Sequence, residues 1–130
     1  MAPIHIQRLL AFVFLGLGGW ALFFPSQVLS LGVRPEYNDG AAITAVVMGC
    51  FGAQAVLCGA IIAFSRFTAQ TFLIFGVLGS LPFFAFNYYF VFVVEMFTEW
   101  MLLDFVGNIA IFALCMLGYL GMKKSGQATT

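Results

Sequence analysis

Four long apolar runs, separated by short polar segments, constrain the fold of this chain more than any other feature. A helix of about 20 apolar residues crosses the roughly 30 Å hydrocarbon core of a bilayer, and the runs cover about residues 9–24, 41–64, 69–94 and 100–122. Of the 130 residues, 63% are hydrophobic and 8% are charged, and a soluble domain of this size has too little interior for so much apolar surface. The sequence therefore predicts an all-α, polytopic membrane protein, with residues 1–130 forming a single bundle of four transmembrane helices.

The first apolar run has a second interpretation as a cleaved signal peptide. It follows Arg8, and the small residue in the segment 28–30 is compatible with a cleavage site. The run nevertheless continues to Pro25 without the polar region that usually precedes cleavage. We therefore expect the first helix to be retained.

The basic residues predict how the bundle is oriented. Four helices place the segments that carry Arg8, Arg66, Lys123 and Lys124 on one side, and Arg34 on the other. Because cytoplasmic segments carry an excess of Lys and Arg, both termini are expected in the cytoplasm. The five acids gather at or near the opposite face: Glu36, Asp39, Glu95, Glu99 and Asp104. Among possible membranes, the plasma membrane or the endoplasmic reticulum is favoured.

Several classes of function lack the residues that they need. The formal net charge is zero, so the chain has no basic surface of the kind that nucleic acid binding requires. On this topology His5, the single histidine, is separated from every carboxylate by the membrane, which leaves no Ser-His-Asp or Cys-His arrangement. Glu95 and Glu99 have no nitrogen or sulfur ligand beside them, so neither a metal nor another cofactor is predicted. No catalytic residue is assigned, and an enzyme is the less favoured class.

The three cysteines are scattered through the apolar runs: Cys50, Cys58 and Cys115. An odd number of thiols at such positions is typical of packing inside helices and not of a disulfide framework. We expect all of them to be free.

Residues 86–108 hold three of the five acids and two asparagines within otherwise apolar sequence. The third and fourth helices are joined by a short connection and therefore run antiparallel. Asn87 and Asn108 lie about equally far from that connection, and so at similar depth. Asp104 precedes Asn108 by one helical turn and shares its face. We predict that Asn87, Asp104 and Asn108 form one polar cluster in the outer half of the bundle.

A carboxylate at the expected depth of Asp104 needs a partner. We expect Asp104 beyond the first turn of its helix, where the helix dipole has weakened, with Thr98 as the N-cap. Arg34 is the basic residue on the same side and the candidate for an ion pair. Asn87, Asn108 or a tyrosine hydroxyl are the other candidate partners. Structural hydrogen bonding, contact with another protein, and the handling of a proton, ion or ligand all remain open as roles.

Small residues repeat at every fourth position along the second helix and predict close helix packing. One ridge comprises Ala41, Ala45, Gly49 and Ala53, and the other comprises Ala55, Gly59 and Ala63. Such ridges let backbones approach, because lipid chains provide no hydrophobic drive for helix association. We expect this helix at the centre of the bundle, with Gly49 and Gly59 in interhelical contacts. Gln54 is expected to form an interhelical hydrogen bond, with a contact in an oligomer as the second interpretation.

The segments GWALFFPSQVLSLG (residues 19–32) and MGCFGAQAVLCG (residues 48–59) resemble the pattern of small, four-helix, DoxX-like membrane proteins. In that pattern an aromatic and apolar helix ends at a proline, and a glycine-spaced helix follows. The resemblance covers about the first half of the chain. It implies a four-helix bundle and assigns no functional residue.

Two classes of function fit this sequence better than the others. The leading hypothesis is an accessory, assembly or homo-oligomeric subunit that acts through helix–helix contacts, with membrane lipids and another membrane protein or a second copy as partners. The alternative is a small transporter, or a protein that binds a lipid or hydrophobic ligand, using the cluster of Asn87, Asp104 and Asn108. A membrane enzyme with a lipid substrate ranks last.

Overall fold

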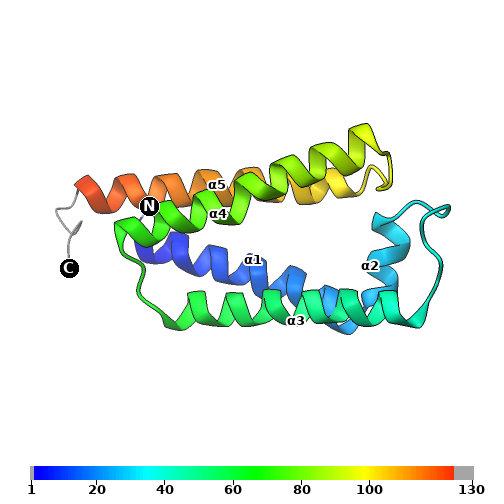
Figure 1. Cartoon of the computed structure of the whole chain (residues 1–130). Coiled ribbons are helices and arrows are strands. Elements are labelled where there is room, and N and C mark those ends of the chain that lie inside the picture. The colour runs from blue at the N-terminus through cyan, green and yellow to red at the C-terminus, as the bar shows by residue number, and fades with distance from the viewer. Residues whose placement is uncertain (1, 125–130) are drawn as a thin grey trace.

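The computed structural model describes residues 2–124, and every regular element in that range is a helix (Figure 1). The α-helices are α1 (Pro3–Phe23), α2 (Pro25–Gly32), α3 (Ala42–Phe64), α4 (Ala69–Tyr88) and α5 (Met101–Lys124), and a π-helix, η1 (Tyr89–Val93), continues α4. Four stretches, namely α1, α3, α4 with η1, and α5, are long and apolar enough to cross a membrane. The predicted all-α fold with four long apolar helices is confirmed, and it fits a multi-pass integral membrane protein.

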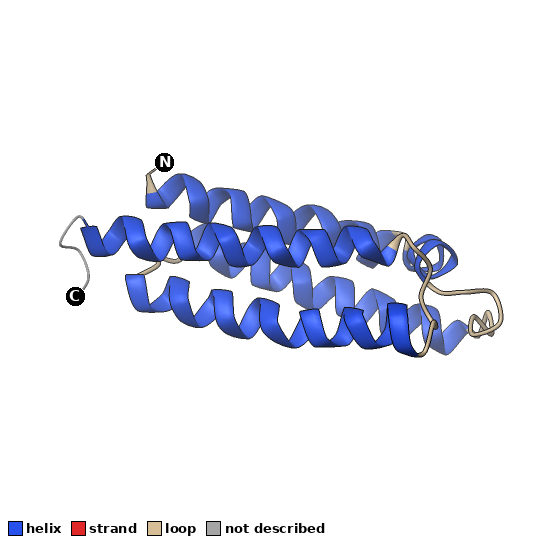
Figure 2. Cartoon of the chain, turned by 90° about the horizontal axis from the view of Figure 1, so that it is seen from above, coloured by secondary structure: helices blue, strands red, loops and turns tan. Residues whose placement is uncertain are grey.

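The four long helices form two pairs. α1 packs along α3, α4 packs along α5, and α1 also contacts α5. Figures 1 and 2 show that α1 begins and α5 ends at the same end of the bundle, the terminal end, while α2 lies at the opposite end, the α2 end. The two pairs diverge toward the α2 end (Figure 1). The assignment of the terminal end to the cytoplasm stays a prediction.

The terminal end is tightly packed. Its most deeply buried side chains come from all four long helices and are Ile6, Leu10, Ile62, Phe72 and Cys115. Glycine allows the closest approach between α4 and α5, since a Cβ at Gly76 would lie 2.6 Å from the Cβ of Cys115. The buried core of the bundle therefore lies at the terminal end.

Gln7 anchors the connection between α3 and α4 and was missed by the sequence analysis. It is 4% exposed, because α1 begins at Pro3 and not near residue 9 as predicted. Its Nε2 donates to the carbonyl oxygens of Ile62, at 2.6 Å, and Ser65, at 2.7 Å, and its Oε1 accepts from the Phe67 amide at 3.2 Å. Gln7 thus satisfies backbone groups that the end of a helix leaves unpaired.

Helix α3 lies at the side of the bundle, so its predicted central position is wrong. It packs against α1 and α2, and α1 has the larger set of buried residues. The close contact uses Gly52, where a Cβ would lie 2.3 Å from the Leu22 nitrogen, and Gly59, where a Cβ would lie 2.8 Å from Leu15 Cγ. The nearest atom to a Cβ at Gly49 is 3.9 Å away, an ordinary contact. Only some of the small residues of α3 therefore serve the close contact with α1, and others, such as the exposed Ala53, lie on a different face.

Candidate functional site

The two helix pairs border a cavity of about 580 Å³ at the α2 end of the bundle. Its lining comes from α1, α2, α3, α4, α5 and the segment 97–100. The volume lies within the range of about 300–1,000 Å³ that is typical of sites for small molecules. The sequence analysis did not predict this cavity.

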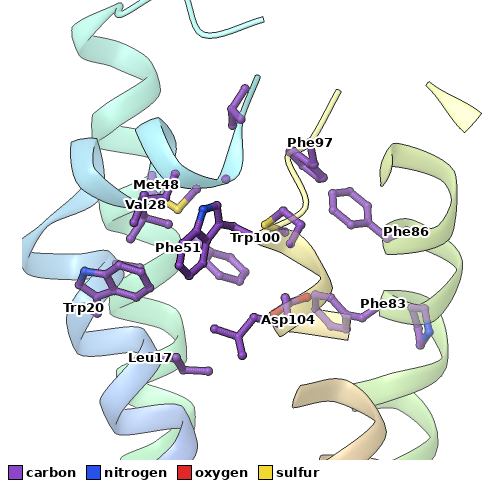
Figure 3. A pocket seen from close by; sticks show the side chains of 17 residues that line it. Leu17, Trp20, Val28, Met48, Phe51, Phe83, Phe86, Phe97, Trp100 and Asp104 are labelled. Carbon is purple, nitrogen blue, oxygen red and sulfur yellow. The ribbon is translucent and has the colours of Figure 1, made fainter. Parts of the chain in front are cut away.

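The walls of the cavity are almost entirely apolar. The side chains labelled in Figure 3 are Leu17, Trp20, Val28, Met48, Phe51, Phe83, Phe86, Phe97, Trp100 and Asp104. Both tryptophans of the chain, Trp20 and Trp100, are among them. A concave, aromatic and aliphatic lining with few polar groups is typical of sites for hydrophobic ligands.

Backbone contacts tie the end of α2 to the segment between η1 and α5. Val33 and Phe97 form an isolated antiparallel bridge, and the Arg34 amide donates to the Met96 carbonyl oxygen at 3.0 Å. The Thr98 amide donates to the Gly32 carbonyl oxygen at 2.9 Å. Because α2 lines the cavity through Val28 and Leu31, these contacts fix α2 as part of the cavity wall.

The Thr98 hydroxyl belongs to the same set of contacts, which corrects its predicted role as a helix cap. It donates to the carbonyl oxygen of Leu31. The turn before α5 is instead held by backbone bonds, such as that from the Met101 amide to the Thr98 carbonyl oxygen at 3.1 Å.

Arg34 pairs with Glu95 and not with Asp104, whose partners come instead from the other candidates, Asn87 and Asn108. The Arg34 Nη1 lies 3.6 Å from Glu95 Oε2, and Nε donates to the Phe97 carbonyl oxygen at 3.2 Å. Glu95 adopts a positive φ of 53°, an uncommon conformation for a residue other than glycine. The bridge between Val33 and Phe97 places Arg34 beside the loop that joins η1 to α5. Arg34 therefore reaches Glu95, the carboxylate of that loop.

The structure brings together the three residues of the predicted polar cluster, Asn87, Asp104 and Asn108. The Asn87 Nδ2 donates to Asp104 Oδ2 at 2.8 Å, and the Asn108 Nδ2 donates to the same oxygen at 2.9 Å. The Asn108 Nδ2 also donates to the Asp104 carbonyl oxygen at 2.8 Å. Asn87 is 1% exposed and Asn108 is 6% exposed, whereas Asp104 lines the cavity. Two buried amides thus orient one carboxylate in the cavity wall.

Asp104 lies in the first turn of α5, contrary to the prediction that it lies deeper in the helix. The shift arises because α5 begins at Met101. A carboxylate in this position is stabilised by the partial positive charge at a helix N-terminus. Part of the stabilisation of Asp104 therefore comes from its own helix.

Two acceptor atoms of the cluster remain without donors. Both amides donate to Asp104 Oδ2, and within residues 2–124 no hydrogen bond to Asp104 Oδ1 is found. Asn87 Oδ1 is buried and has no partner among those residues either. The cluster can therefore accept further hydrogen bonds. No group of three His, Cys, Asp or Glu that could hold a metal ion occurs in the described part of the chain.

Gln54 is exposed on α3, and the hydrogen bond predicted for it inside the bundle is absent among the described residues. The face of α3 that carries Gln54 points away from α1, because the contact with α1 uses Gly52 and Gly59. The cysteines are free thiols, as expected.

No protein-family model matches the chain, and no curated protein or solved structure is significantly similar to it. The resemblance to DoxX-like proteins stays a prediction.

Proposed function

We propose that the protein binds a small hydrophobic molecule or a lipid chain in the cavity at the α2 end. The observation that carries this proposal is the cavity itself, about 580 Å³ with an apolar and aromatic lining and one carboxylate in its wall. It develops the ligand-binding alternative of the sequence analysis and ranks it above an accessory subunit.

The membrane setting determines what such a site can select. Lipid chains are as apolar as the cavity walls, so burial of an apolar ligand gains little over its place in the bilayer. Selectivity then rests on the shape of the cavity and on Asp104. With the termini in the cytoplasm, as the basic residues predict, the cavity lies in the non-cytoplasmic half of the membrane, with the plasma membrane or the endoplasmic reticulum as the favoured location.

A pair of variants on α3 tests the proposal. Met48 lines the cavity, whereas its neighbour Val47 is exposed on the outside of the bundle. Met48→Trp fills part of the cavity, and Val47→Trp adds the same side chain outside it. Native mass spectrometry of protein extracted in its own lipid should detect a bound molecule on the wild type and on Val47→Trp, and lose it on Met48→Trp. Identical bound species on all three proteins would contradict the proposal.

A second candidate function is self-association through the outer face of α3, which the exposed Gln54 favours. A glutamine amide at membrane depth gains from a hydrogen bond to another helix. Cys50 is also exposed and lies one helical turn before Gln54, on the same face. Mild oxidation of membranes should then give a disulfide-linked dimer that disappears in Cys50→Ser and weakens in Gln54→Leu. A monomer under all these conditions would exclude this face as a dimer contact.

A further inference from the structure

We propose that the cavity selects amphiphiles that carry a protonated amine, with the ammonium group held by Asp104 and the alkyl or aromatic body held by the apolar walls. This inference rests on the proposed ligand-binding function and specifies its ligand class. The geometry of the cluster, the charges around it and the lining of the cavity support it separately.

Charge is the first argument. Of the 17 residues that line the cavity, only Asp104 has an ionisable side chain. The cation on the same end of the bundle, Arg34, is paired with Glu95. Asn87 and Asn108 donate hydrogen bonds to Asp104 but carry no charge. A ligand cation would therefore supply the positive charge that the cavity lacks.

The hydrogen-bonding pattern is the second argument. Both amides donate to Oδ2 of Asp104, and within the described residues Oδ1 is left as an acceptor. An ammonium group has three donors and no acceptor, which matches an unoccupied carboxylate oxygen. A hydrogen bond to an ionised carboxylate is roughly twice as strong as a neutral one, and an ammonium group adds the attraction between two opposite charges. A carboxylate or phosphate group on the ligand would instead be repelled, and a hydroxyl would donate a single hydrogen bond and bring no positive charge.

The aromatic lining is the third argument. Trp20 and Trp100 both line the cavity that contains Asp104 (Figure 3). Aromatic faces attract cations, and tryptophan does so most strongly. The same rings provide apolar contact for the body of the ligand. The cavity thus combines the two properties that a cationic amphiphile needs.

The two tryptophans also provide the test. Because the chain has no others and both line the cavity, a bound ligand should change its tryptophan fluorescence. Trp100 is also 64% exposed and senses the bilayer, so the saturable part of the change is the signal from the cavity. The purified protein in nanodiscs of zwitterionic phosphatidylcholine is titrated at neutral pH with dodecylammonium, dodecanol and dodecanoate, which share one chain and differ in the head group. Empty nanodiscs correct for partition into the bilayer.

We expect dodecylammonium to bind the wild type at least tenfold more tightly than dodecanol, with dodecanoate weakest. In Asp104→Asn the preference for dodecylammonium over dodecanol should fall to about twofold or less. Glu36→Gln, the same change at an exposed acid outside the cavity, should keep the wild-type preference.

The outcomes separate this inference from the proposed function. If dodecanol binds the wild type as tightly as dodecylammonium, the cavity binds hydrophobic ligands and the selection of cations is overturned. If none of the three compounds gives a saturable change, both are overturned. If Asp104→Asn retains the full preference, Asp104 is not the group that selects the cation. The ranking on the wild type decides the question even where Asp104→Asn fails to fold.

Discussion

The contact between α1 and α3 supports one wall of the cavity, and Gly52→Ala tests that contact with a single added methyl group. A Cβ at position 52 would lie 2.3 Å from the Leu22 nitrogen and 2.7 Å from the Gly18 carbonyl oxygen. Both are backbone atoms that cannot rotate away, so the two helices must move apart. Overpacking of this kind costs about 1–3 kcal/mol, and α3 regains up to about 1 kcal/mol because alanine favours a helix over glycine.

We expect the upper part of the overpacking range and a net loss of about 2 kcal/mol in the free energy of unfolding. Gly49→Ala is the matched control on the same helix, because the nearest atom to its Cβ is the Leu22 carbonyl oxygen at 3.9 Å. That variant should be unchanged or more stable by up to about 1 kcal/mol. Unfolding in mixed micelles of increasing dodecyl sulfate content, followed by far-ultraviolet circular dichroism, measures both. Equal stability of the two variants would refute the close contact between α1 and α3.

Two further changes test the contacts at either end of the bundle. Gln7→Leu removes the donors to the Ile62 and Ser65 carbonyl oxygens and the acceptor for the Phe67 amide, and it should cost about 3 kcal/mol in the same unfolding assay. The control is Gln70→Leu, at an exposed glutamine of α4, which should change the free energy of unfolding by about 0.5 kcal/mol or less. A similar loss in both variants would contradict the role assigned to Gln7. Glu95→Gln breaks the ion pair with Arg34, whose side chains are 64% and 37% exposed, and should cost less than about 1 kcal/mol. That cost should shrink further at high salt, and a larger, salt-independent loss would show that the pair is more than a surface contact.

The long helices could be predicted because each membrane span is a continuous run of about 20 apolar residues. Length and hydropathy identify each span, and the bounds of α3, and of α4 taken together with η1, agree closely with the prediction. The predicted start of α1 is too late, because the polar residues His5, Gln7 and Arg8 precede the continuous apolar run. Pro25, at the first turn of α2, is a common start for a helix, but eight residues are too short to register as a span.

The polar cluster could also be predicted, since it depends on two simple relations. Asp104 and Asn108 share a helical face, and the short connection sets the depth of Asn87 against them. The partner of Arg34 could not be predicted, because it depends on how α2 packs against the loop that holds Glu95. Arg34 follows directly after Val33, which the bridge to Phe97 fixes in place.

The outward position of Gln54 could not be predicted from the hydropathy of α3. α3 is apolar on all sides, so hydropathy does not identify the face that contacts its neighbour. Small residues occur on more than one face, and only the packing on α1 determines which of them are used. The cavity could not be predicted for a similar reason: it depends on packing, namely on the divergence of the two helix pairs and on the position of α2.

The most direct test of a ligand in the cavity is photolabelling with an amphiphile that carries a diazirine on its alkyl chain, followed by mapping of the labelled peptides. The account predicts saturable labelling within residues 17–21, 48–51, 83–86 and 97–104, and loss of that labelling in Met48→Trp. Labelling that does not saturate and that falls on outward-facing side chains such as Phe12 and Phe64, which are 73% and 92% exposed, would contradict it.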